Sequence, residues 1–337
     1  MSDERIRAKQ THMMCMGRRA LLGLAVLCAA IVSLPAAAQA QHYPSKPLKL
    51  IVPYPPGAAT DNIARAFGQE LAKIMGQPVI VENRPGGGSS VGIVAAKAQP
   101  ADGYTLLVRA EGFYAAKLAT PTLAYEFSDF EILAPLAQSS YAFIVAADRG
   151  WKQLDDLKKA QREIDVGSLD LGVGVYSTLA ARMAKDLGIR FRTIPFKGGA
   201  EGLTAILAGQ IDAYFTTIGT TQAVKDSPKV KVLATTGLPG SGNNFLPGVK
   251  TFQELGLPNM AFSSSYSLNV RSDTPAPIKE QLARAVQEAL ASEAMKAARR
   301  QLFLEPYAGS VLDYRRDQAR VLKEFETALA EDGKATK

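Results

Sequence analysis

The chain has 337 residues, with 39 Lys and Arg against 32 Asp and Glu, and a formal net charge of +7. The positive charge is spread along the sequence without a dense basic block, which argues against a nucleic-acid-binding protein. Two histidines and two cysteines in the whole chain leave few candidates for metal ligation or nucleophilic catalysis.

The first 40 residues have the three parts of a secretory signal peptide. Arg18 and Arg19 precede an apolar stretch at 20–34, and small residues follow up to Ala40. The apolar stretch is shorter than the roughly 20 residues needed to cross a bilayer, so a signal peptide is favoured over a membrane anchor. We therefore predict a signal peptide at 1–40, cleavage after Ala40 and a periplasmic location.

Cleavage would change the inventory of reactive side chains. Cys15 and Cys28 lie within the signal segment, so the mature chain has no thiol for a disulfide or a thiolate metal site. His42 is then the single histidine, beside the new N-terminus. A Ser-His-Asp site or a zinc hydrolase needs imidazole in a cleft. We therefore expect no catalytic residue, no metal and no cofactor.

In the first half, short apolar runs alternate with helical patterns, which predicts an α/β protein. Strands are expected at 48–52, 79–81 and 105–108. After the first strand, apolar residues recur at helical spacing, at Ile63, Phe67, Leu71 and Ile74. Thr60 or Asp61 is expected to cap this helix, and Gly76 to end it.

The same alternation resumes in the second half. Strands are expected at 164–166, 192–194, 211–215 and 230–234, with helices at 177–187, before 207, after Pro275 and after Ser310. Two further strands, at 141–145 and 266–270, are predicted to cross between two lobes as a hinge. They define a discontinuous first lobe at 41–142 and 266–337 and a second lobe at 143–265. The length also indicates two domains, at about 150 residues each.

Residues 53–61 connect the first strand to the first helix. The opening amides of a helix lack internal partners and its dipole is positive there, so this loop could hold an anion. The candidate ligand contacts are Tyr54, Gly57, Ala58, Ala59 and Thr60. A capped helix without ligand explains these residues equally well.

Residues 168–178 repeat the arrangement in the second half. The candidate contacts are Ser168, Gly172, Gly174, Val175, Tyr176, Ser177 and Thr178. Residues 172–174 resemble a dinucleotide loop, but Ser177 replaces its third glycine and no basic residue is present for a polyphosphate. Two facing helix starts without basic side chains suit a small carboxylate instead.

Residues 88–92 fit the G-x-S-x-G pattern of α/β-hydrolases. That pattern requires a histidine downstream, and none follows His42. A serine esterase using Ser89 or Ser90 is therefore a weak alternative. A flexible turn in which Ser89 or Ser90 caps a helix is favoured, and either hydroxyl could also reach the ligand.

Several blocks of sequence resemble the solute-binding receptors of tripartite tricarboxylate transporters, the Bug family. The blocks are residues 43–47, 51–57, 77–86, 101–107, 195–198 and 209–212, in the family's order. The resemblance covers essentially the whole mature chain. It implies a periplasmic, two-lobed binding-protein fold of type II, a small organic acid as ligand and membrane permease subunits as partners. In that family both helix-start loops contact ligand.

The two loops depart from the family pattern. Ala58 stands where a second glycine is usual, and Asp170 and Tyr176 interrupt the usual Ser-x-Gly-x-Gly-Ser of the second loop. We therefore expect an altered pocket and hypothesise an aromatic or monocarboxylic ligand, unlike citrate, stacked on Tyr176. A sensory receptor with the same pocket is the alternative to transport.

Overall fold

The computed structural model describes residues 43–110, 112–170, 174–196, 198–237 and 245–335. Lys46–Lys337 forms one compact unit, to which the following description applies. The predicted signal segment and its cleavage site lie outside the described residues, as does His42.

The strands form one continuous sheet, and each of its two ends, together with the helices packed on it, is called an α/β layer here. The first α/β layer is built on three parallel strands, as the apolar runs predict. β1 (Leu48–Val52) pairs with β2 (Val79–Asn83) on one side and with β3 (Thr105–Arg109) on the other. β3 continues antiparallel to β9 (Ser263–Arg271), which pairs with β4 (Phe130–Ala146). Four of the five residues of β1 are buried, which fits a parallel strand covered by helices on both faces.

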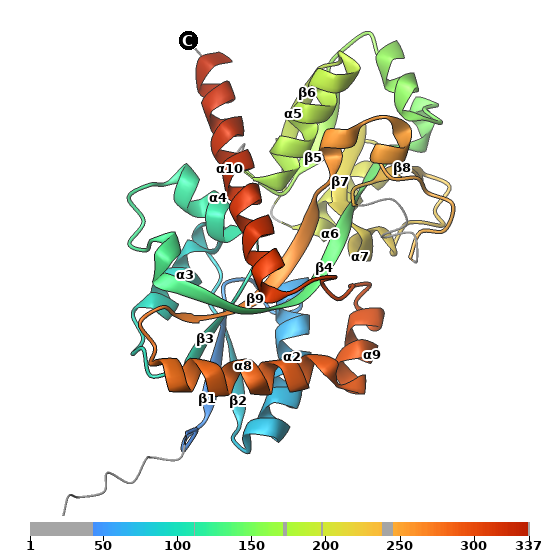
Figure 1. Cartoon of the computed structure of the whole chain (residues 1–337). Coiled ribbons are helices and arrows are strands. Elements are labelled where there is room, and N and C mark those ends of the chain that lie inside the picture. The colour runs from blue at the N-terminus through green and yellow to red at the C-terminus, as the bar shows by residue number, and fades with distance from the viewer. Residues whose placement is uncertain (1–42, 111, 171–173, 197, 238–244, 336–337) are drawn as a thin grey trace, which may run out of the picture. The chain divides into compact units, whose positions relative to one another are not determined.

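Helices cover this layer (Figure 1). They are α2 (Ala59–Met75), α3 (Ser90–Lys97), α4 (Gly112–Ala119), α8 (Ala276–Ala291) and α9 (Glu293–Gln301). Ile63, Phe67 and Leu71 are fully buried, which confirms the predicted apolar face of α2. Gly76 ends α2 with φ +66°, as predicted, because a left-handed residue without a Cβ stops the helix cheaply.

The second layer repeats the pattern. β5 (Ile164–Ser168) lies parallel to β6 (Phe191–Pro195) and to β7 (Ala213–Thr217), while β7 and β8 (Val230–Thr235) pair antiparallel with β4. Its helices are α5 (Val175–Leu187), α6 (Gly199–Leu207) and α7 (Ile218–Thr221). Short 3-10 turns complete the chain at Gly87–Ser89, Phe127–Asp129, Ala147–Arg149, Leu154–Lys159, Gln253–Leu255 and Pro258–Met260.

The two predicted crossing strands pair with each other over a longer segment than the sequence indicated. β4 and β9 are antiparallel from Phe130 opposite Arg271 to Ser140 opposite Ser263, with two register shifts. β4 then pairs with β7 and β8, so it belongs to both layers. α10 (Val311–Ala335) runs beside these strands (Figure 1). The strands at 141–145 and 266–270 and the helix after Ser310 are therefore confirmed as elements.

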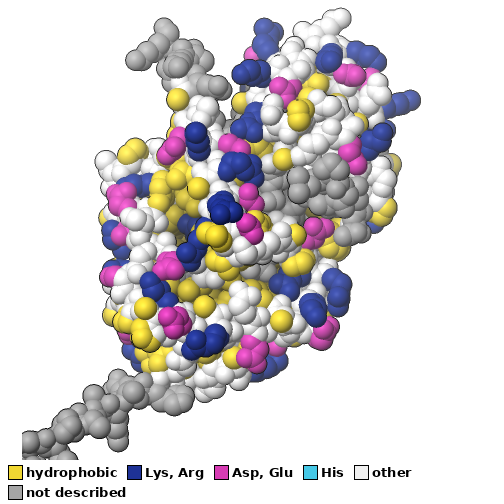
Figure 2. Space-filling model, in the orientation of Figure 1, with side chains coloured by type: hydrophobic (Ala, Val, Ile, Leu, Met, Phe, Trp, Pro, Cys, Tyr) yellow, Lys and Arg dark blue, Asp and Glu magenta, His cyan; other side chains and the backbone are white. Residues whose placement is uncertain are grey.

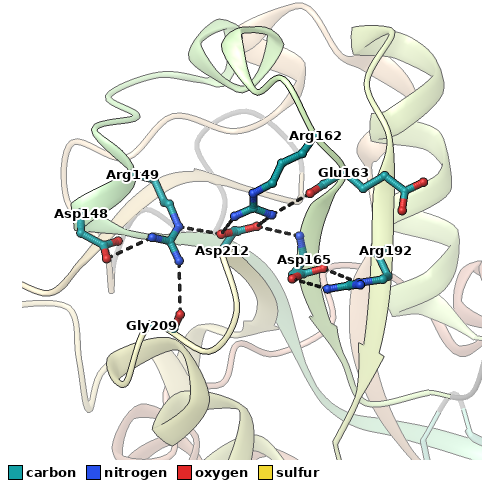
Figure 3. Close-up of polar contacts among 8 residues, drawn as sticks. All are labelled: Asp148, Arg149, Arg162, Glu163, Asp165, Arg192, Gly209 and Asp212. Atoms are coloured by element: carbon teal, nitrogen blue, oxygen red, sulfur yellow. Dashed lines mark hydrogen bonds and ion pairs between the residues drawn. The ribbon is translucent and has the colours of Figure 1, made fainter.

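A charged cluster ties the amino ends of the second layer's strands together (Figure 3). The Asp212 carboxylate, 2% exposed, accepts hydrogen bonds from Arg149 Nε at 2.6 Å and from Arg162 at 2.7 and 2.8 Å. It also accepts from the Asp165 amide at 2.8 Å. Burial alone would raise the pKa of Asp212, but these donors hold the pKa below its ordinary value. The aspartate of the 209–212 block is therefore structural here.

Candidate ligand-binding site

The loop between β1 and α2 is held in shape by one buried carboxylate. Asp61, 2% exposed, accepts from the Gly57 amide at 2.9 Å, from Arg65 Nε at 2.9 Å and from Asn83 Nδ2 at 2.8 Å. Asn83 also donates to the Tyr54 carbonyl at 3.1 Å. Burial alone would raise the pKa of Asp61, but the Arg65, Gly57 and Asn83 hydrogen bonds bring the pKa below its ordinary value. The loop is therefore fixed before any ligand arrives.

The opening amides of α2 are available to an anion. The first helical hydrogen bond runs from the Asn62 amide to the Ala58 carbonyl, at 2.9 Å. The amides of Ala59, Thr60 and Asp61 have no partner among the described residues. Ala58 is the N-cap residue and makes no side-chain cap, so the prediction that Thr60 or Asp61 caps the helix is wrong. Asp61 instead braces the loop from inside the first turn, which leaves the helix front open.

Ser89 adds a hydroxyl to this region. Its backbone is left-handed, with φ +86°, an uncommon conformation for a residue with a Cβ. The side chain is 4% exposed, and its Oγ has no hydrogen-bond partner among the residues described. Ser89 precedes α3 without a side-chain cap, so the prediction that its hydroxyl caps this helix is wrong. A Cβ added to Gly112 would lie 3.1 Å from Ser89 Oγ and 2.7 Å from the Tyr54 hydroxyl. Three segments therefore bring Tyr54, Ser89 and Gly112 together at the carboxyl end of the first layer.

The second helix-start loop differs from the prediction. Asp170 accepts from the Tyr176 amide at 2.8 Å and from the Ser177 amide at 3.2 Å, at the start of α5. The expectation of two helix fronts with unpaired amides is therefore wrong for α5. A carboxylate of the chain itself takes these donors, because the turn brings Asp170 back onto the helix that follows it.

The other predicted residues of this loop that the structure describes contact other parts of the protein. Ser168 Oγ donates to Asp170 Oδ1 at 2.9 Å, and Thr178 Oγ1 donates to the Gly174 carbonyl at 2.7 Å. The Tyr176 ring, 9% exposed, packs edge-to-face on Tyr141 with ring centroids 5.2 Å apart. Val175 is buried. Gly172 lies outside the described residues.

Arg109 is a feature that the sequence analysis missed. It ends β3, is 3% exposed, and donates to Ser267 Oγ at 3.3 Å and to the Tyr114 hydroxyl at 3.1 Å. No carboxylate in the described part of the chain forms an ion pair with it. It lines a cavity of about 300 Å³ with Tyr114, Phe127, Phe130, Glu131, Ile132, Ser272 and Arg315. Hydrophobic side chains gather between α4 and α10 on the face in Figure 2.

Comparison with known proteins decides the family. Residues 63–329 match the family model described as "Tripartite tricarboxylate transporter family receptor". The chain belongs to this receptor family. The match spans most of both layers, including β4 and β9, so the resemblance noted in the sequence is confirmed.

A curated relative and two solved structures are similar to this chain. A UPF0065 protein of Agrobacterium vitis, named for the TAR-I ttuE-ttuC' intergenic region, is 35% identical over 276 residues, covering 79% of this chain and 78% of its own. The periplasmic binding protein BugD superposes with a TM-score of 0.70 at 25% identity, covering 87% of this chain and 99% of BugD. Rpa4515 of R. palustris, solved with adipate, superposes with a TM-score of 0.75 at 23% identity, covering 86% of this chain and 98% of Rpa4515.

The family places this chain among two-lobed α/β periplasmic-type binding proteins, as the sequence predicted. It is a solute-binding receptor of the tripartite tricarboxylate type. Within the described residues, no helix combines the length and apolar character needed to span a membrane. Nor does that part of the chain hold a cluster of three His, Cys, Asp or Glu side chains suited to a metal ion.

Proposed function

We propose that this receptor works in the periplasm, where it captures a small organic acid between two lobes and presents it to membrane permease subunits. The lobes would be 41–142 with 266–337, and 143–265, joined where β4 and β9 cross. Two-lobed receptors of this kind close by hinge motion around the ligand. The chain would leave the cytoplasm through a signal peptide at 1–40 and would catalyse nothing.

The observation that carries the proposal is the set of unpaired donors at the front of α2. Three consecutive amides there have no partner in the part of the chain described, and the Ala59 amide belongs to an exposed residue. Ser89 Oγ, buried and without a partner, lies in the neighbouring turn. Backbone donors at a helix start are suited to a carboxylate, which needs no cationic side chain there. Adipate in the R. palustris relative supports the carboxylate class.

A hydrolytic role for Ser89 is not favoured. Its Oγ has no basic partner among the described residues, and no histidine follows His42 in the sequence. A nucleophilic serine needs a base within hydrogen-bond reach. The unpaired hydroxyl is better explained as a donor kept for the ligand's carboxylate.

The test is native mass spectrometry of the mature protein, secreted into a bacterial periplasm and purified without refolding. We expect a chain that begins at Gln41 and carries a small organic acid. Isothermal titration calorimetry with mono-, di- and tricarboxylates then measures affinity for the free protein. A chain that carries no acid and binds no member of the panel would contradict the proposal. A mass that retains residues 1–40 in the periplasm would contradict the predicted cleavage.

A further inference from the structure

The start of α5 is occupied by a carboxylate that belongs to the chain. Asp170 Oδ2 accepts from the Tyr176 amide at 2.8 Å, and both carboxylate oxygens lie 3.2 Å from the Ser177 amide. Ser168 Oγ donates to Oδ1 at 2.9 Å. Three donors thus contact the Asp170 carboxylate, with the Ser177 amide shared between its two oxygens. The Tyr176 and Ser177 amides are therefore already engaged and are not free for a ligand carboxylate.

The backbone around Asp170 is shaped to admit a carboxylate. Gly174 has φ +149°, and a Cβ placed on it would lie 2.6 Å from Asp170 Oδ2. The Asp170 amide also donates back to Ser168 Oγ at 3.1 Å, which closes the turn. Gly174 and Ser168 thus hold the acid group against the helix start. This geometry is what a ligand carboxylate would need at the same place.

We propose that Asp170 determines specificity by filling, with its own acid group, the position that the second carboxylate of a diacid would take. This inference rests on the proposed function, in which the α2 amides and Ser89 hold one carboxylate of the ligand. A second carboxylate near α5 finds the Tyr176 and Ser177 amides taken and meets a like charge. The receptor therefore selects monocarboxylates whose other end is uncharged.

The ring beside this position agrees with an uncharged ligand end. Tyr176 presents its ring at the start of α5 and packs on the fully buried Tyr141. Among the described residues, the donors to the Asp170 carboxylate are the Ser168 hydroxyl and the Tyr176 and Ser177 amides, and none is a basic side chain.

Matched acids of equal length test the inference. Calorimetry on the mature chain compares hexanoate with adipate, butyrate with succinate, and 4-methylbenzoate with terephthalate. In the pair that binds most tightly, the native protein should bind the monoacid at least about tenfold more tightly than the diacid. This factor corresponds to the free energy of one hydrogen bond to a charged group, which the second carboxylate of the diacid cannot form. Asp170→Ser should shift that ratio toward the diacid by at least about tenfold, because it frees the Tyr176 and Ser177 amides.

Two further variants make the result decisive. Asp170→Asn removes the charge but keeps one oxygen for the amides, so it serves if Asp170→Ser does not fold. Asp186→Asn removes an equal charge from an exposed position near the other end of α5 and should leave the ratio unchanged.

The outcomes separate the two proposals. A native protein that prefers the diacid, or a ratio that neither Asp170 variant changes, overturns the specificity role but leaves the proposed function intact. Absence of binding for every acid contradicts the proposed function, and the specificity role falls with it.

Discussion

Replacing Ala59 by proline removes one donor from the front of α2 and changes little else. Ala59 is the first residue of α2, and its amide has no partner among the described residues. Proline is well tolerated at this position, because a first helical residue needs no N–H. Ala58 already has φ −65° and ψ 158°, the extended conformation that a residue before proline prefers.

The size of the effect follows from the kind of contact removed. A hydrogen bond to a charged group contributes about 1.5–3 kcal/mol. At about 1.4 kcal/mol per tenfold, the loss of one such bond weakens binding by about 10- to 100-fold. We expect Ala59→Pro to raise the Kd for the co-purified acid by this factor in isothermal titration calorimetry. The thermal midpoint of the free protein should change by less than about 4 °C, because we expect the substitution to lower the free energy of unfolding by less than about 1 kcal/mol.

Two control variants separate the amide from the side chain and from proline itself. Ala59→Gly keeps the N–H and should bind the acid within about fivefold of the native protein, since the glycine changes the free energy of the helix by less than about 1 kcal/mol. Glu293→Pro places proline at the exposed first residue of α9, after the N-cap residue Ser292, and should leave affinity unchanged. Native-like affinity in Ala59→Pro would refute the role of the α2 amides.

Three further variants test the geometry. Ser89→Ala removes a buried hydroxyl without a partner, so we expect unchanged or higher stability of the free protein but at least about tenfold weaker acid binding; equal affinity would contradict it. Gly174→Ala places a Cβ 2.6 Å from Asp170 Oδ2, so we expect about 1–3 kcal/mol lower stability in urea unfolding. Asp212→Asn should lower the free energy of unfolding by about 1–3 kcal/mol at pH 7, because it weakens the hydrogen bonds from Arg149 and Arg162. The lowered pKa of Asp212 means that its contribution is present above about pH 4 and lost as pH falls through the folded-state value. Below about pH 4, the free energy of unfolding of the variant should therefore change less with pH than that of the native protein. The same pH dependence in both proteins would contradict this prediction.

The strands and helices could be predicted where the apolar pattern was regular. The spacing of Ile63, Phe67 and Leu71 identified the buried face of α2 because helical periodicity alone determines that face. The first part of β4 was not predicted. Pro135 lies within it, next to a register shift between Pro135 and Ala137, and proline normally argues against a paired strand. The bulge that tolerates the proline depends on pairing with β9, which is distant in the sequence.

The candidate site was predictable only in part, for a similar reason. The front of α2 could be located because a strand, a turn rich in small residues and a helix follow one another directly. The role of Asp170 could not, since it depends on a turn that returns a side chain to amides six and seven residues later. Arg109 was missed because the sequence does not say what the last residue of β3 will face.

A crystal structure of the receptor with its co-purified acid is the most direct measurement of how the ligand is held. We predict a carboxylate oxygen about 2.7–3.2 Å from the Ala59 and Thr60 amides, with Ser89 Oγ donating to the same group. Asp170 should still accept from the Tyr176 and Ser177 amides. An acid group bound instead by Arg109, or seated at the start of α5 with Asp170 displaced, would contradict the proposed mode of binding.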